Sequence, residues 1–304
     1  MSNDIRIKKG LDIKLKGEAK QATEIAIISN FYSIRPEDFH GVIPKMIVKV
    51  GEKVKAGDSV FYDKANDSVK FASPVSGEII EITRGEKRKI LAVKIQGDKT
   101  QEYQDHGKFN LETAKANDIK NHLLASGCWP FIKQRPYDVI ANPDSSPKAI
   151  FISSYASAPL AADYDFTLKG KEDQLQAAIY ALAKLTDGKV HVSIGEQSIS
   201  PFFGLSGITL HKVSGPHPSG NVGTQINKIN PINKGEVVWT INPQDLVIIG
   251  DLLLTGKFNA ERIVALTGSA IQKPRYFVTK LGCEIATMVF DHGIEKEANV
   301  RIIS

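Results

Sequence analysis

The chain has 304 residues, of which 42% are hydrophobic and 24% are charged, and its net charge is +5 at pH 7. This length allows two or three domains, each with its own hydrophobic core. The basic residues are dispersed and form no stripe with interleaved aromatic residues, so we expect no nucleic acid as a partner. The two cysteines, Cys128 and Cys283, exclude a disulfide scaffold and a cysteine-ligated cluster within this chain.

Residues 1–100 are predicted to form a small barrel or sandwich of short β-strands. Alternating or apolar segments, including 4–15 and 24–29, recur between Gly and Pro residues, which is typical of all-β domains. A short basic run at 84–89 is expected on a solvated loop or strand end, although contact with an anionic membrane face or an acidic partner stays open. The polar stretch 97–110 predicts the first domain boundary.

Residues 57–77, GDSVFYDKANDSVKFASPVSG, resemble the hairpin on which lipoyl and biotinyl domains present a modified lysine. Counting from the flanking Gly and Pro places the symmetric apex near Ala65–Asn66. Lys64 is therefore predicted to be displaced by one or two residues, and a slip of one residue turns a side chain to the other face. We expect a protruding structural hairpin at 60–72 with an unmodified Lys64.

Residues 109–257 change from strand-like to helical spacing. The order of strand, helix and strand predicts a parallel α/β architecture. The expected helices are 117–127, 173–188 and 243–257, and the expected strands are 148–155, 189–194 and 237–242. From about residue 258 the pattern returns to strands, at 261–268, 276–282 and 283–290. The chain then stops on an alternating segment, which predicts a truncated protein.

The longest apolar run, 246–254, is too short to span a bilayer and contains Asp251. The N-terminal residues include no apolar segment of the kind found in signal peptides. We therefore expect a reducing, cytoplasmic location and any membrane attachment through other proteins.

A loop at 214–225, SGPHPSGNVGTQ, has a spacing that fits no known phosphate-binding loop. Its glycines give G-x4-G-x2-G, and Asn221 stands where a P-loop requires Lys. Two prolines stiffen the loop, while the glycines let a ligand or partner approach the backbone. A rigid, largely exposed ligand or partner loop and a plain connection stay equally open.

No catalytic or metal-binding constellation is visible in the sequence. His211 and His217 have no third ligand at a plausible spacing, so hydrogen-bonding roles are expected. Cys128 has apolar neighbours and is expected to be a small buried residue.

Six ordered blocks resemble the A subunit of the bacterial sodium-translocating NADH:quinone oxidoreductase. The resemblance runs the length of the chain, in 7–13, 69–88, 146–153, 215–224, 237–256 and 273–279. It implies an α+β multidomain fold in three parts. These are a biotinyl/lipoyl-like barrel-sandwich domain at 1–108, a Rossmann-like α/β domain at 109–257, and a partial ubiquitin-like β-grasp domain of the SLBB type at 258–304.

The resemblance also implies a function in a membrane complex. The chain would lie on the cytoplasmic face of the bacterial inner membrane, held there by partner subunits and involved in quinone reduction coupled to Na+ export. FAD, FMN, riboflavin and iron–sulfur clusters would belong to the partners, so the isolated chain would bind no cofactor and would not be catalytic. Quinone contact is possible, and the candidate contact residues are Gly215, Pro216, His217, Pro218, Gly220 and Gly223.

Two alternatives come from other classes of protein. One is a flavin-binding NADH dehydrogenase module related to the flavoprotein subunit of respiratory complex I. Segment 126–136, SGCWPFIKQRP, replaces the Gly-rich flavin loop of that relative, and the cluster cysteines are missing. The other is a carrier protein modified at Lys64.

Overall fold

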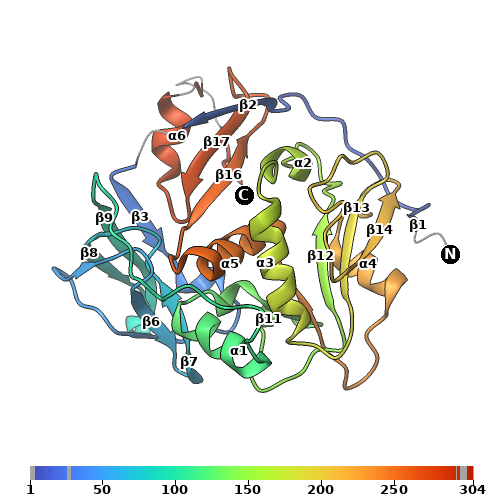
Figure 1. The fold of residues 1–304 in the computed structure, drawn as a ribbon. Helices are drawn as coiled ribbons and strands as arrows, with labels where there is room; N and C mark the ends of the chain where they lie inside the picture. Colours follow the sequence, from blue (N-terminus) through green and yellow to red (C-terminus); the bar gives the residue numbers. More distant parts are fainter. Residues whose placement is uncertain (1–3, 26–28, 292, 295–299, 304) are drawn as a thin grey trace.

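The computed structural model describes residues 4–25, 29–291, 293–294 and 300–303. These residues form three packed parts: a β-barrel-like part, a seven-stranded α/β part and a three-stranded part (Figure 1). The α+β multidomain fold expected from the sequence is therefore present.

The barrel-like part consists of two sheets with an apolar interior. One sheet has the order β3-β9-β8-β5 and the other β4-β6-β7. The rings of Phe61 and Phe71 stack inside with centroids 4.5 Å apart, and Phe61 is fully buried. The strands are β3 (Phe31–Ile34), β4 (Pro44–Met46), β5 (Lys53–Val54), β6 (Ser59–Asp63), β7 (Asn66–Ala72), β8 (Gly77–Arg84) and β9 (Ile90–Gly97), with short 3-10 helices at Pro36–Asp38 and Glu86–Arg88.

The β6–β7 hairpin is present, but its turn differs from the one that counting predicts. Asp63 pairs with Asn66, so Lys64 and Ala65 form the two-residue turn. The predicted displacement of Lys64 from the apex is wrong. The pairing contains two register shifts, between Ser59 and Phe61 and between Tyr62 and Asp63. The first shift leaves one extra residue on β6 and the second leaves three extra residues on β7. A symmetric count from the flanking residues therefore misplaces the turn.

The α/β part is built on a seven-stranded sheet of order β1-β14-β13-β12-β15-β10-β11. The first five strands are parallel, whereas β10 and β11 run antiparallel to their neighbours. The strands are β1 (Asp4–Arg6), β10 (Lys133–Arg135), β11 (Val139–Ile140), β12 (Ile150–Ser154), β13 (Val190–Gly195), β14 (Ile208–Ser214) and β15 (Val238–Thr240).

Helices cover both faces of this sheet. Ile150 and Ile152 of β12 belong to the main core, together with the apolar residues of α3 and α5. Phe151, between them, packs with Ile226 of α4 on the opposite face. This alternation explains why β12 is apolar at successive positions, as expected for a strand buried on both sides. The helices are α1 (Ala116–Ala125), α2 (Tyr164–Thr167), α3 (Glu172–Ala183), α4 (Val222–Ile229) and α5 (Pro243–Thr255), with a 3-10 turn at Trp129–Phe131.

The predicted elements of this part agree with the structure to within a few residues at most ends. Helix α5 begins at Pro243 after the capping residue Asn242 and ends at Gly256, whose φ is 76°. Helix α3 ends earlier than predicted, at Ala183. Gly188 is instead required where the next strand begins, because a Cβ there would lie 1.9 Å from the Lys148 carbonyl oxygen. No helix in the described part of the chain is long and apolar enough to cross a membrane.

The third part is a sheet of order β16-β17-β2 with helix α6. Strands β16 (Glu261–Leu266) and β17 (Arg275–Lys280) are antiparallel, while β2 (Lys20–Ile25) pairs with β17 in parallel. Residues 283–290 were predicted as a strand, which is wrong, because Ile285–Asp291 form α6. The β-branched residues of this segment favour a strand by propensity, and tertiary packing, with Val289 1% exposed, overrides that preference.

The first two strands also lie outside the barrel in which the sequence pattern places them. Strand β1 is at one edge of the seven-stranded sheet and pairs with β14. Strand β2 is at the edge of the three-stranded sheet. Local alternation predicts a strand but not its partner, since the partners of β1 and β2 lie some 200 residues or more further along the chain. The boundaries at 108 and 257 stay predictions.

Candidate functional site

A cleft opens at the point where the order of the parallel strands reverses. The chain adds β13 and β14 on one side of β12, and β15 on the other side. In open α/β sheets, the crevice at the carboxyl ends of the strands at such a point is the usual ligand site. Here a cleft of about 720 Å³ lies between Ser153 and Tyr155 at the end of β12, Thr240 at the end of β15, and Asn221 and Gly223 at the start of α4. We call it the switch-point cleft.

Only part of the predicted glycine loop lies at this cleft. Gly220 and Gly223 line the switch-point cleft. Gly215 lines a neighbouring cleft of about 480 Å³ at the ends of β12, β13 and β14. Gly215 has a φ of 116°, a value that disfavours side chains with a Cβ. At Gly220 a Cβ would lie 2.4 Å from the Ser157 backbone nitrogen, so the loop is tightly packed against the segment after β12.

His217 braces the loop from several directions. Its backbone N–H donates to the Asp12 carboxylate at 2.8 Å, and its carbonyl accepts from the Leu11 N–H at 3.0 Å. Its ring Nδ1 lies 3.1 Å from Ser157 Oγ. Residues from Gly215 to Pro218 are half-buried and Ser219 is fully buried. The prediction of a largely exposed loop is therefore wrong, because the N-terminal segment and the loop after β12 cover it.

A lysine that the sequence analysis did not single out lies beside the cleft. Lys133, on β10, lines both the switch-point cleft and a second cavity. Its Nζ lies 4.7 Å from the centroid of the Phe39 ring, a cation–π geometry. Burial lowers the pKa of Lys133, while Asp245 and Asp138 oppose that change. Lys133 is therefore a partly desolvated cation at the border of two cavities.

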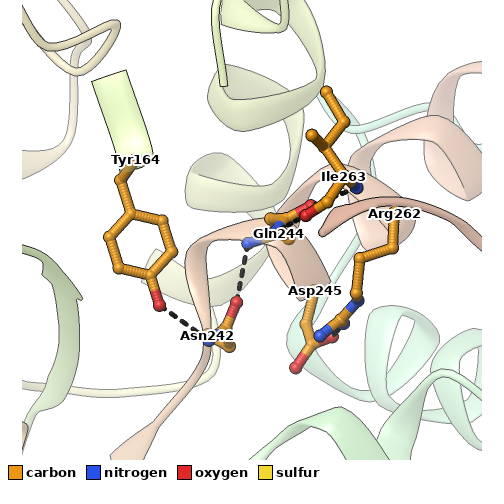
Figure 2. A network of polar contacts seen from close by, with 6 residues as sticks. All are labelled: Tyr164, Asn242, Gln244, Asp245, Arg262 and Ile263. Atoms are coloured by element: carbon orange, nitrogen blue, oxygen red, sulfur yellow. Dashed lines mark hydrogen bonds and ion pairs between the residues drawn. The ribbon is translucent and has the colours of Figure 1, made fainter. Parts of the chain in front are cut away.

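An ion pair at the start of α5 lies next to this lysine. The guanidinium of Arg262, on β16, contacts the carboxylate of Asp245, and both side chains are mostly buried. Burial raises the pKa of Asp245, and the Arg262 guanidinium and Lys133 act in the opposite direction. The pair links the α/β part to the three-stranded part (Figure 2).

Neighbouring amide side chains extend this link. Gln244 exchanges two hydrogen bonds with the backbone of Ile263, at 2.9 Å and 2.8 Å, and so attaches β16 to the first turn of α5. Asn242 accepts from the Gln244 N–H at 3.0 Å and donates to the Tyr164 hydroxyl at 3.1 Å (Figure 2). The start of α5 is therefore held between α2 and β16, next to the cleft.

The second cavity, of about 310 Å³, lies where the three parts meet. Its walls include Phe39 and Phe71 of the barrel and Phe131 and Phe258 of the α/β part. Its charged lining residues are Arg35, Asp38, Lys133, Asp245 and Arg262. Apolar walls with a few placed polar groups are what a site for a flat organic molecule requires. We call it the three-part cavity.

Cys128 and His211, the other residues weighed in the sequence analysis, lie in the core of the fold and not in either cavity. Cys128 is fully buried and burial raises the pKa of its thiol, as expected for a small core residue. His211 contacts the ring of His191 at 3.0 Å and does not form a pair with His217. Among the described residues, no group of three or more His, Cys, Asp or Glu side chains could hold a metal ion.

Sequence reasoning missed Lys133, Asp245 and Arg262 because their importance depends on the junction of three parts. One signal was available: Asn242 and Pro243 predict a helix start directly after a strand. Such a start points to the ligand edge of the sheet.

Family models match three consecutive parts of the chain. Residues 5–98 match the NqrA N-terminal barrel-sandwich hybrid domain, residues 114–258 match the NqrA second alpha/beta domain, and residues 263–304 match the NQRA C-terminal domain. The chain is therefore a protein of the class that combines a barrel-sandwich domain, an α/β domain and an SLBB-type domain.

Curated relatives share this organisation in sequence. The A subunit of the Na(+)-translocating NADH-quinone reductase of Pseudomonas aeruginosa (strain UCBPP-PA14) is 36% identical over 302 residues, which cover 99% of this chain and 67% of the relative. The proteins of the same name from Neisseria meningitidis serogroup A and Serratia proteamaculans are 34% and 36% identical, with the same coverage of each chain. The chain belongs to the NqrA family, the A subunits of the Na(+)-translocating NADH-quinone reductase.

Proposed function

We propose that this chain acts in the quinone-reduction step of a sodium-translocating NADH:quinone reductase, by docking and quinone-proximal contact rather than by carrying a redox group. The name of the family's curated relatives supports the reaction. The observation that carries the proposal of contact is the switch-point cleft, which Gly220 and Gly223 line at the carboxyl ends of the strands.

The three-part cavity supports a quinone-proximal position. A quinone ring needs apolar walls and one or two hydrogen-bond donors. Phe131 and Phe258 stack on each other, with ring centroids 6.1 Å apart and ring planes 11° apart, and form one aromatic surface of the cavity. Lys133 also lines the cavity. The residues present therefore fit a quinone ring next to the switch-point cleft.

The finer parts of the proposal concern the assembled enzyme. FAD, FMN, riboflavin and iron–sulfur clusters belong to partner subunits, and the isolated chain is not catalytic. Its two cysteines are too few to ligate an iron–sulfur cluster. The chain lies on the cytoplasmic face of the bacterial inner membrane through its partners. We expect the isolated chain to bind NADH and FMN more weakly than about 1 μM by titration calorimetry.

Substitution of Gly223 tests the proposed contact. A Cβ at Gly223 would meet no atom within 4 Å, so the first side-chain atom has open space at this position. We expect Gly223→Trp, measured in the whole complex, to raise the quinone KM or reduce co-purification with the partner subunits by about tenfold. Gly223→Ala is the matched control and is expected to behave like the native chain.

His217→Ala separates two versions of the proposal. A raised quinone KM with intact assembly would favour quinone contact. Loss of assembly would favour docking, which we expect because the His217 ring contacts Ser157 and braces the loop. Unchanged activity and assembly in both Gly223→Trp and His217→Ala would contradict a role for this loop.

A further inference from the structure

Residues 8–19 form a segment without helix or strand that joins the edges of two sheets. Strand β1, before it, is the outer strand of the seven-stranded sheet, and β2, after it, is the outer strand of the three-stranded sheet. The segment runs along the outside of the molecule between them (Figure 1). We call residues 8–19 the N-terminal strap.

The strap is fixed at both ends. The Leu11 N–H donates to the His217 carbonyl at 3.0 Å, and the Gly268 N–H donates to the Gly17 carbonyl at 3.0 Å. Between these points, no backbone hydrogen bond joins residues 13–16 to any other residue that the structure describes. The middle of the strap therefore presents unpaired backbone donors and acceptors, as the edge of a sheet does.

Apolar side chains alternate along the same stretch and face solvent. Leu11, Ile13 and Leu15 are 72%, 58% and 56% exposed. These three residues alternate with Asp12 and Lys14 in the sequence, and we call them the apolar row. An exposed apolar row on an unpaired edge is a feature that proteins usually cover.

Charge is concentrated in and around the strap. Residues 5–20 contain six Lys or Arg and two acidic residues, which leaves most of the net charge of +5 in this segment. Lys14 and Lys16 alternate with the apolar row and are exposed. A partner that covers the strap therefore needs acidic groups beside apolar ones.

We propose that residues 11–16 of the N-terminal strap bind an extended, acidic segment of a partner protein of the complex, which adds to the strap as a β-strand. Backbone pairing would satisfy the free donors and acceptors of residues 13–16, and alternate side chains would give specificity. A lipid surface fits less well, because burying the apolar row in lipid would leave these backbone groups without partners. The proposal rests on the docking function proposed above, since the strap contacts the loop through Asp12 and Leu11.

Hydrogen–deuterium exchange of the whole complex and of the isolated chain tests the pairing. We expect the amides of residues 13–16 to exchange rapidly in the isolated chain and about 100-fold more slowly in the complex. Equally fast exchange in both would overturn the proposal and leave the docking function standing. Absence of the native chain from the purified complex would instead overturn the docking function, and the strap proposal with it.

Variants separate backbone pairing from the apolar row. Ile13→Pro removes one donor from an extended segment, and we expect about tenfold less of it to co-purify with the partners, with unchanged thermal unfolding of the isolated chain. The triple variant Leu11→Thr, Ile13→Thr, Leu15→Thr should also weaken assembly. Ile199→Thr is the control, because Ile199 is 87% exposed and lies outside the strap.

Vesicles identify the lipid alternative. The isolated chain is mixed with phosphatidylglycerol vesicles, and the double variant Lys14→Gln, Lys16→Gln is the comparison. Vesicle binding that is lost in this variant, with residues 13–16 still unprotected in the complex, would overturn the proposed strand pairing in favour of a lipid contact. No vesicle binding, together with protection in the complex, would support it.

Discussion

The barrel-like part and the α/β part differ in the polar side chains that they bury. In the barrel, the buried polar side chains that the structure describes include Ser73 and Ser76, whose hydrogen bonds reach nearby backbone groups. The α/β part encloses ionisable groups: Lys133, His191, and Asp245 with Arg262 from the adjoining strand. Burying charge costs free energy, so it occurs where geometry or function requires it. The enclosed ionisable groups named here therefore lie in the α/β part and at its junction with the three-stranded part, which supports the site proposed there.

The largest expected effect comes from breaking the Asp245–Arg262 pair. Arg262→Ala leaves a mostly buried carboxylate without its partner, which should lower the free energy of unfolding by about 3 kcal/mol. Urea denaturation would measure this loss. Arg84→Ala, at an exposed site in the barrel, is the control and should change stability by less than about 0.5 kcal/mol. Similar losses in both variants would contradict the contrast between the two parts.

A comparable effect is expected from lowering the pH. Burial, with help from His211 and Lys189, lowers the pKa of His191 from 6.5 to about 4. The folded protein then binds fewer protons than the unfolded chain between these values, so stability should fall as the pH drops from 6.5 to 4. His191→Gln should flatten this part of the stability profile. His40→Gln, at an exposed histidine of the barrel, should leave it unchanged.

Helix caps in the α/β part provide a matched pair. Asn242 caps α5 through a hydrogen bond to the Gln244 N–H, whereas Asn221 precedes α4 without a side-chain cap bond. We expect Asn242→Ala to cost about 1 kcal/mol of unfolding free energy, and Asn221→Ala only a few tenths. Thermal unfolding of both variants measures the difference. Equal costs would mean that the cap is not what stabilises the start of α5.

The smallest effect is expected at the hairpin turn of the barrel. Lys64 is exposed and lies in the β6–β7 turn, so Lys64→Ala should change the free energy of unfolding by less than about 0.5 kcal/mol. We expect Lys64 to be unmodified in protein from its native host, which intact mass measurement would check. A mass addition of a lipoyl or biotinyl group would contradict the contrast between the two parts, since the barrel would then carry a modified lysine.

Sequence patterns predict the features that depend on neighbouring residues. Helix α5, with Asn242 before Pro243 and Gly256 at its end, is predicted almost to the residue because its start and stop signals are local. The β6–β7 hairpin is likewise predicted, although bulges shift its turn. The three-part fold rests on the resemblance of six blocks, and the family models confirm it.

The parts of the site that sequence did not predict depend on distant residues. Phe39 and Lys133 meet across two domains, and Arg262 reaches Asp245 from a third. The spacing of neighbouring residues cannot predict such contacts, because each of these residues has the sequence surroundings of an ordinary core or surface position. The half-burial of the glycine loop could not be predicted, since the covering residues Leu11 and Asp12 lie about 200 positions earlier.

The pairing of β2 with β17 has a consequence for biosynthesis. Residues 20–25 leave the ribosome early, but their partners at 275–280 are made about 250 residues later. At typical rates of about 5–20 residues per second, the N-terminal strand waits roughly ten seconds or more for its partner. The three-stranded sheet can therefore close only after residues 275–280 have been made.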